Sequence, residues 1–163
     1  MSDYKLNPGD SAPDIELPVY SQDNPEGTLK LSDLEGKWVI LYFYPKDSTP
    51  GCTTESCEFR DALPDFSGAD ATIIGVSRDS IKSHANFTEK QALNFPLISD
   101  ADELLCKAFD VMQLKKNYGK EYMGVERSTF IINPEGDVAY AWRQVKVAGH
   151  VEEVLNTLKE LQS

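Results

Sequence analysis

The chain has little of what would direct it to a nucleic acid or a membrane. Its 163 residues contain 16 Lys and Arg against 27 Asp and Glu, which gives a net charge of −11. Nucleic acids and anionic lipid surfaces bind basic protein surfaces, so this balance argues against both as partners. No apolar stretch is long enough to span a bilayer, and the first eight residues show no basic-then-apolar signal pattern. We therefore expect a cytoplasmic protein.

Cysteine is also scarce. The chain has Cys52, Cys57 and Cys106 and no C-x-x-C pair, which argues against a dithiol oxidoreductase of thioredoxin type. In a reducing compartment, neighbouring cysteines are more often catalytic or metal-binding than structural. A zinc site from these three with His84 and His150 would lack the usual ligand spacing, so we expect no metal and no cofactor. Burial as an inert small side chain is an alternative for each cysteine.

Apolar segments with the pattern of strands alternate along the chain with segments that have the pattern of helices. With 40% apolar residues, the length suits one domain spanning residues 1–163. The expected elements are a hairpin over 15–31, a strand over 38–44, a helix from about 50 that ends near 63 before Pro64, a strand over 72–77, a helix over 80–93, an extended segment over 95–99, a helix over 101–112, a loop over 115–123, a strand over 127–132, a hairpin turn into 138–142 and a helix over 151–161.

The strand over 38–44 is apolar at nearly every position, which indicates a central strand covered on both faces. Alternating strands and helices that end in a hairpin and a helix predict an α/β class. The expected architecture is a thioredoxin-like fold, with a mixed central sheet flanked by helices and an N-terminal β-hairpin extension. In the helix over 101–112, Cys106 falls away from the apolar face, so we expect a partly exposed bystander thiol.

The function is expected where the central strand turns into a helix. Thr49 is a good N-cap residue and Pro50 a good first helical residue, which places Cys52 third in the helix. Unpaired N–H groups and the helix dipole favour an anion there, and the thiolate is the reactive form of cysteine. Gly51 would let other atoms approach the sulfur closely, so it is counted among the substrate-binding residues.

The neighbouring side chains oppose a thiolate. Asp47, Glu55 and Glu58 are acidic and would raise the pKa of the Cys52 thiol. A reactive cysteine here needs a cation from elsewhere in the fold. Arg127, at the start of an apolar strand, is the best candidate, and a surface charge at a strand end is the alternative.

Cys57 follows Cys52 by five residues. In an ideal helix their Cα atoms are roughly 8.6 Å apart, because five residues rise ~7.5 Å and turn well past one revolution. A disulfide requires Cα atoms within about 7 Å, so the two cysteines cannot be bridged while both are helical. Any bond between them requires the first turns of the helix to unwind.

The segment from Pro45 to Cys52, with Thr49 between them, resembles the P-x-x-x-T-x-x-C motif of peroxiredoxins. The Tyr-Phe-Tyr-Pro run over 42–45 and the position of Cys57 are similar to the PrxQ branch, also called bacterioferritin comigratory protein. The resemblance covers nearly the whole chain and includes the Arg-Ser-Thr-Phe run that begins at Arg127.

The resemblance implies a role for each matching residue. Cys52 would attack the peroxide O–O bond and become a sulfenic acid, which Cys57 would resolve as an intramolecular disulfide. Thr49 and Arg127 would bind the sulfur and the peroxide oxygens, and Pro45 would shield the pocket. The family's usual reductant is thioredoxin, and glutaredoxin serves in some members.

The leading hypothesis is therefore a monomeric, thioredoxin-dependent atypical 2-Cys peroxiredoxin of PrxQ type. It would reduce hydrogen peroxide and organic hydroperoxides in antioxidant defence and redox homeostasis. One alternative is a thioredoxin-fold binding or chaperone-like module whose thiols are incidental. Another is a general disulfide reductase, against which the missing C-x-x-C weighs.

Overall fold

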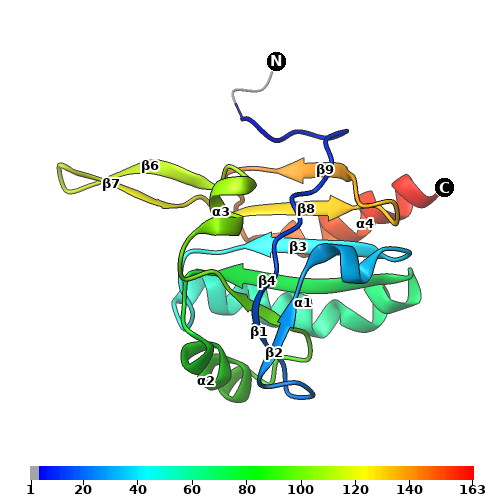
Figure 1. Cartoon of the computed structure of the whole chain (residues 1–163), viewed down its shortest axis with the longest axis horizontal. Coiled ribbons are helices and arrows are strands. Elements are labelled where there is room, and N and C mark those ends of the chain that lie inside the picture. The colour runs from blue at the N-terminus through cyan, green and yellow to red at the C-terminus, as the bar shows by residue number, and fades with distance from the viewer. Residues whose placement is uncertain (1–3) are drawn as a thin grey trace.

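The computed structural model describes residues 4–163 and has a mixed sheet with helices on both faces (Figure 1). The elements are, in chain order, β1 Leu17–Tyr20, β2 Gly27–Leu29, the 3-10 helix η1 Leu31–Leu34, β3 Trp38–Phe43, α1 Pro50–Gly68, β4 Ala71–Ser77, α2 Ile81–Gln91, β5 Leu97–Ser99, α3 Leu104–Ala108, β6 Met112–Asn117, β7 Lys120–Val125, β8 Ser128–Ile132, β9 Val138–Trp142 and α4 His150–Gln162.

Seven strands form the main sheet in the order β2-β1-β5-β4-β3-β8-β9. β3 runs parallel to β4 and antiparallel to β8, so the sheet is mixed. β1 and β2 form the expected N-terminal hairpin, and β1 extends the main sheet by pairing with β5. The predicted fold class is confirmed, including the helices that flank the sheet.

Side chains of β3 alternate between two hydrophobic cores, because successive residues of a strand point to opposite faces. Leu41 and Phe43 pack with the N-terminal segment, η1 and α3 on one face. Ile40 and Tyr42 pack with α1, α2 and α4 on the other. Both faces are therefore covered, and the polar turn at the end of β3 is held between two packed layers.

Pro64 does not end α1, which continues to Gly68, so the expected boundary near 63 is wrong. A proline inside a helix leaves the carbonyl four residues earlier without its N–H partner. That carbonyl belongs to Arg60, and it accepts a hydrogen bond from Asn94 Nδ2 at 3.2 Å. A residue from the β5 side of the fold thus replaces the missing helical bond.

The expected helix over 101–112 and the loop over 115–123 are also wrong. Only α3 is helical, and its start is fixed by the Asp100 carboxylate, which accepts from the N–H groups of Leu105 and Cys106. The chain then forms the two-stranded ribbon of β6 and β7. Tyr118 and Gly119 connect these strands with φ of 51° and 78°, the pair of positive φ values that a two-residue hairpin turn needs.

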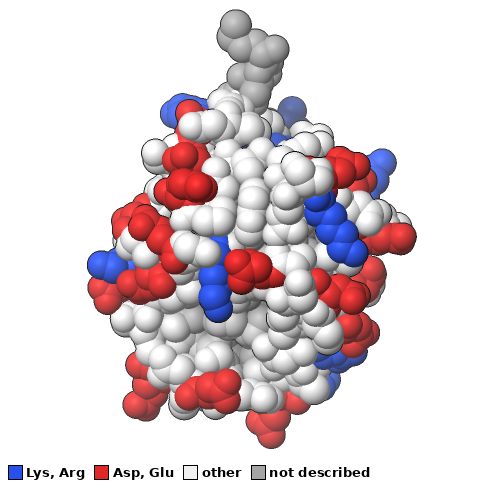
Figure 2. Space-filling view, turned by 90° about the vertical axis from the view of Figure 1, so that its right-hand side faces the viewer, with Lys and Arg blue, Asp and Glu red and all other residues white. Residues whose placement is uncertain are grey.

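The two ends of the main sheet differ in shape and charge. The β6–β7 ribbon projects beyond the rest of the chain on the side where β3 and β4 end (Figure 1). The opposite end, where β3 begins, is a rounded surface on which acidic side chains predominate (Figure 2).

Candidate active site

The turn from β3 into α1 places Cys52 in the first turn of the helix, with only 1% of the side chain exposed. Thr49 is the N-cap residue, as expected, but its hydroxyl does not cap the helix. Instead, Thr49 Oγ1 donates to the carbonyl of Lys46 at 2.8 Å. The first N–H groups of the helix have no intrahelical partner, so they contribute a positive potential near the Cys52 sulfur.

Arg127 supplies the distant cation that the acidic surroundings require. It lies between β7 and β8, and its Nη2 donates to Cys52 Sγ at 3.3 Å. Gly51 gives the guanidinium its space, because a Cβ at this position would lie 3.2 Å from Arg127 Nη2. The fold thereby places the Arg127 guanidinium against the sulfur of a residue 75 positions earlier in the chain.

Glu55 is a site residue whose role the sequence did not reveal. Its Oε1 accepts from Arg127 Nη1 at 2.6 Å, and its side chain is fully buried. Burial raises the pKa of Glu55 to about 7, although the charge of Arg127 lowers it. Its other oxygen, Oε2, is buried without a hydrogen-bond partner among the described residues. The available signal was the three-residue spacing from Cys52, which puts both side chains on one face of α1.

The loop before α1 is anchored by Asp47, which is 5% exposed. Its carboxylate accepts from Tyr44 Oη at 2.6 Å and from Ser83 Oγ at 2.8 Å, and it lies 2.7 Å from His84 Nδ1. His84 Nε2 lies 2.9 Å from the Ile98 carbonyl. The imidazole thus connects this loop to β5 from a fully buried position in α2.

Pro45 lies within this anchored loop and is half-buried. The backbone of Asp47 adds a further restraint, because its N–H donates to Asp79 Oδ2 at 2.8 Å. The loop that carries Pro45 and Thr49 is therefore fixed at several points before the helix begins.

Cys57 lies one and a half turns further along α1 and is half-buried where α1 meets α2. Its Sγ is 3.5 Å from Gln91 Oε1, and Arg60 Nη1 is 3.6 Å from the same sulfur. Arg60 Nη1 also donates to the Gln91 carbonyl at 2.6 Å. Cys52 and Cys57 are both helical and both free, as expected for the reduced protein.

Cys106 is fully buried in α3, so its expected partial exposure is wrong. Burial raises the pKa of its thiol well above the ordinary range, and the charge of Asp100 raises it further. Such a thiol stays protonated and unreactive at neutral pH.

The two histidines are buried as well. His150 is 5% exposed and its Nε2 lies 2.8 Å from Thr129 Oγ1. Burial lowers the pKa of His150 to about 4. Within residues 4–163, no group of three or more His, Cys, Asp or Glu side chains is placed to hold a metal ion.

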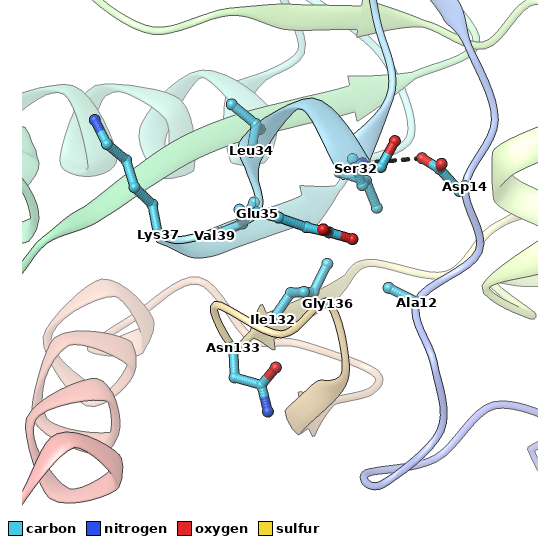
Figure 3. A pocket seen from close by; sticks show the side chains of 11 residues that line it. Ala12, Asp14, Ser32, Leu34, Glu35, Lys37, Val39, Ile132, Asn133 and Gly136 are labelled. Carbon is cyan, nitrogen blue, oxygen red and sulfur yellow. Dashed lines mark hydrogen bonds between the residues drawn. The ribbon is translucent and has the colours of Figure 1, made fainter.

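A small cavity of about 60 Å³ lies far from this site, at the beginning of β3 (Figure 3). Lys37, Glu35 and Asn133 contribute to its lining, and Asp14 accepts a hydrogen bond from the Ser32 N–H at its edge. This volume holds only a few water molecules, and Cys52 is not among the residues that line the cavity. It therefore takes no part in the chemistry of the Cys52 thiol.

The helices of the described part of the chain are not suited to a bilayer. None of those in residues 4–163 combines the length and the apolar composition that crossing a membrane requires.

Known proteins resemble this chain over almost its full length. The model of the AhpC/TSA family matches residues 8–141. Peroxiredoxin Bcp of Bacillus subtilis is 56% identical over 153 residues, which are 94% of this chain and 95% of the relative. A peroxiredoxin Q of Xylella fastidiosa superposes with a TM-score of 0.90 at 48% identity, over 97% of this chain and 98% of the other.

A bacterioferritin comigratory protein of Xanthomonas campestris superposes with a TM-score of 0.87. It is 49% identical over 99% of this chain and 100% of its own, and its structure addresses the alkyl peroxide reduction activity of that protein.

The fold and these relatives define the class of protein as a peroxiredoxin, which is a peroxidase. The chain belongs to the AhpC/TSA family, and its relatives within that family are the Bcp or PrxQ proteins. The resemblance carried by Pro45, Thr49, Cys52 and Cys57 is confirmed at the level of the family. The roles of the individual residues stay predictions.

Proposed function

We propose that this protein reduces hydrogen peroxide and organic hydroperoxides through Cys52. The observation that carries the proposal is the Arg127 guanidinium 3.3 Å from Cys52 Sγ, at the N-terminus of α1. The thiolate attacks one peroxide oxygen, the O–O bond breaks, and the other oxygen leaves as water or an alcohol after taking a proton. The sulfur is oxidised by two electrons to a sulfenic acid. A hydroperoxide is a fitting substrate because alkyl peroxide reduction is the activity of a close structural relative.

Neighbouring groups support this step by position. Arg127 can follow the negative charge as it moves from sulfur to oxygen, and Glu55 holds the guanidinium in place at 2.6 Å. The Thr49 hydroxyl already donates to the Lys46 carbonyl, so its lone pairs are free to accept from a peroxide O–H. Pro45 and Gly51 complete the substrate-binding part of the site, Pro45 by excluding water.

Cys57 completes the oxidative half of the cycle. Its sulfur attacks the Cys52 sulfenic acid, an S–S bond forms, and the sulfenic oxygen leaves as water. The cysteines cannot meet while α1 is intact, so the first turns of α1 unwind in each cycle. Asp47 and its partners anchor the loop that precedes the turns that unwind.

A dithiol protein closes the cycle by giving up two electrons and two protons, which returns both cysteines to thiols. Thioredoxin is the proposed reductant and glutaredoxin a substitute. We propose that the protein acts as an antioxidant enzyme in the cytoplasm. We also propose that it is a monomer, because Cys52 and Cys57 belong to one chain and their disulfide requires no partner subunit.

Mass spectrometry after one equivalent of hydrogen peroxide tests the chemistry. The wild-type protein should lose two hydrogens and give a peptide linked through Cys52 and Cys57. Cys57→Ser should stop at a sulfenic acid on Cys52, which a dimedone adduct reports. Cys52→Ser should lose peroxide consumption.

Cys106→Ser is the matched control, because it removes a thiol that is outside the site. It should keep the wild-type rate and the same linkage. Peroxide turnover retained in Cys52→Ser, or a linkage that includes Cys106, would contradict the assignment.

A further inference from the structure

The β6–β7 ribbon, residues 112–125, stands out from the rest of the chain by its exposed apolar side chains. Seven large apolar or aromatic side chains are exposed among residues 4–163, and four of them lie on this ribbon. Their exposed fractions are 57% for Leu114, 99% for Tyr118, 48% for Tyr122 and 54% for Met123. Large apolar patches on a protein surface mark sites of interaction with a partner, and Tyr and Met are enriched at such sites.

The apolar side chains on one face of the ribbon continue the hydrophobic core into solvent. Met112 pairs with Val125 at the root of the ribbon, and both are buried. The next pair on this face is Leu114 with Met123, which is exposed on both strands. Cross-strand pairs of this kind stabilise a sheet, but here nothing in residues 4–163 covers them. This ribbon therefore offers a preformed apolar surface.

The charge of the ribbon is opposite to that of the chain. It carries Lys115, Lys116 and Lys120 against Glu121, a net charge of +2 in a chain of net charge −11. Among the charged side chains at the far end of the molecule, acidic ones are more frequent than basic ones (Figure 2). A basic, apolar projection on an acidic protein selects a partner with an acidic rim around an apolar surface.

The root of the ribbon adjoins the active site. Val125 ends β7 two residues before Arg127, whose guanidinium contacts Cys52. The side chain of Lys115 lies along the bare backbone of Gly124, since a Cβ on Gly124 would come 3.1 Å from Lys115 Cδ. Burial lowers the pKa of Lys115, the charges of Arg127 and Arg78 lower it further, and the charge of Cys52 raises it. A macromolecule seated on the ribbon is thus next to the reacting sulfur.

We propose that the β6–β7 ribbon is the docking surface for the acidic dithiol protein that reduces the oxidised enzyme. This inference rests on the proposed function, because it assumes a disulfide at Cys52 that a protein partner must reach. A small peroxide needs no such surface, and a second copy of this chain has no part in the intramolecular cycle. The proximity of the ribbon to Cys52 favours a partner that visits this cysteine in every turnover.

The test measures peroxide consumption at increasing concentrations of thioredoxin, regenerated by its reductase and NADPH, and separately with dithiothreitol. The double variant Leu114→Ser/Met123→Ser removes the exposed apolar pair. It should raise the KM for thioredoxin about tenfold, which corresponds to about 1.4 kcal/mol. Its rate with dithiothreitol should equal that of the wild type, because a small dithiol does not need the ribbon. The control Tyr140→Ser/Leu161→Ser removes exposed side chains of β9 and α4. It should change neither the KM for thioredoxin nor the rate with dithiothreitol.

A charge reversal tests the second property of the ribbon. Lys116→Glu/Lys120→Glu should raise the KM for thioredoxin and reverse or abolish its increase with salt. The control Lys30→Glu/Lys37→Glu makes the same change of net charge at the opposite end of β3 and should keep the wild-type salt dependence.

The outcomes separate this inference from the function on which it rests. A wild-type protein that turns over with dithiothreitol and not with thioredoxin would overturn the proposed recycling and the docking surface together. Ribbon variants with an unchanged KM for thioredoxin would overturn the docking surface alone. Ribbon variants that lower the molecular mass of the free protein in solution would assign the ribbon to a second copy and also overturn the inference.

Discussion

Cys52 and Cys106 are both buried near the start of a helix, yet their surroundings have opposite charge. Cys52 is 1% exposed and receives a guanidinium N–H on its sulfur. Cys106 is 0% exposed, and burial and the Asp100 carboxylate both raise the pKa of its thiol. The two cysteines share burial and a position early in a helix, and they differ in the charge that the tertiary structure places beside the sulfur. Under the proposed function, that charge is what makes Cys52, and not Cys106, the reactive thiol.

Removing the cation should have the largest effect. Arg127→Gln leaves Cys52 with the same burial and helix position but without the positive charge, which brings it closer to Cys106. We expect the rate of the peroxide reaction to fall by about 10²–10³, the effect of losing one donor to a developing charge. Stopped-flow measurement of sulfenic acid formation gives this rate. Arg127→Lys should recover only part of it, because an ammonium cannot bind Glu55 and Cys52 as a fork. An unchanged rate in Arg127→Gln would refute the comparison.

Glu55 should make stability depend on pH. Its folded-state pKa of about 7 lies above the ordinary value of 4.5, so the folded protein binds the extra proton between these values. The associated stability is fully present below about pH 4.5 and is lost as the pH rises through about 7. We expect wild type to lose about 3 kcal/mol of unfolding free energy over this range relative to Glu55→Gln.

Urea unfolding of the two proteins at pH 4.5 and pH 8 gives this difference. The lowered pKa of His150 has the opposite effect, because the stability that neutral His150 contributes is lost as the pH falls from about 6.5 towards 4. Both proteins contain His150, so this contribution cancels in the difference between their unfolding free energies. Parallel pH profiles for wild type and Glu55→Gln would show that the pKa of Glu55 is the same in the folded and the unfolded protein, which would contradict the prediction.

A substitution at Gly51 tests the same comparison by displacing the Arg127 guanidinium instead of removing it. Gly51→Ala puts a Cβ 3.2 Å from Arg127 Nη2, so the guanidinium must shift by a few tenths of an ångström. We expect the peroxide rate to fall by up to about tenfold, a loss of about 1.4 kcal/mol in transition-state stabilisation. Gly68→Ala is the matched control in the same helix, because nothing lies within 4 Å of its added Cβ. Equal rates for the two alanine variants would show that the position of Arg127 is not critical.

Cys106→Ala should have the smallest effect. It removes a buried sulfur that packs in the core beside Leu105 and Phe109, so the unfolding free energy should fall by about 1 kcal/mol. The peroxide rate should not change. Thermal unfolding and the peroxide assay together check this, and a loss of activity without a loss of stability would give Cys106 a chemical role.

Local sequence determined a large part of this protein. The apolar run of β3 and the Thr49–Pro50 pair were enough to predict a central strand that turns into a helix with Cys52 in its first turn, because these signals act over a few residues. The peroxiredoxin resemblance followed from the same segment, and the family is confirmed.

Tertiary structure decided what depends on contacts between distant residues. The helix continues past Pro64 because the side chain of Asn94, from outside the helix, satisfies the freed carbonyl. The β6–β7 ribbon is instead a local hairpin, whose turn at Tyr118 and Gly119 was not recognised from the sequence. Burial of Cys106 and of Glu55 was equally outside the reach of periodicity. The sequence required a cation for Cys52, but only the folded chain brings Arg127 across 75 residues to its sulfur, because charge acts through space and not along the chain.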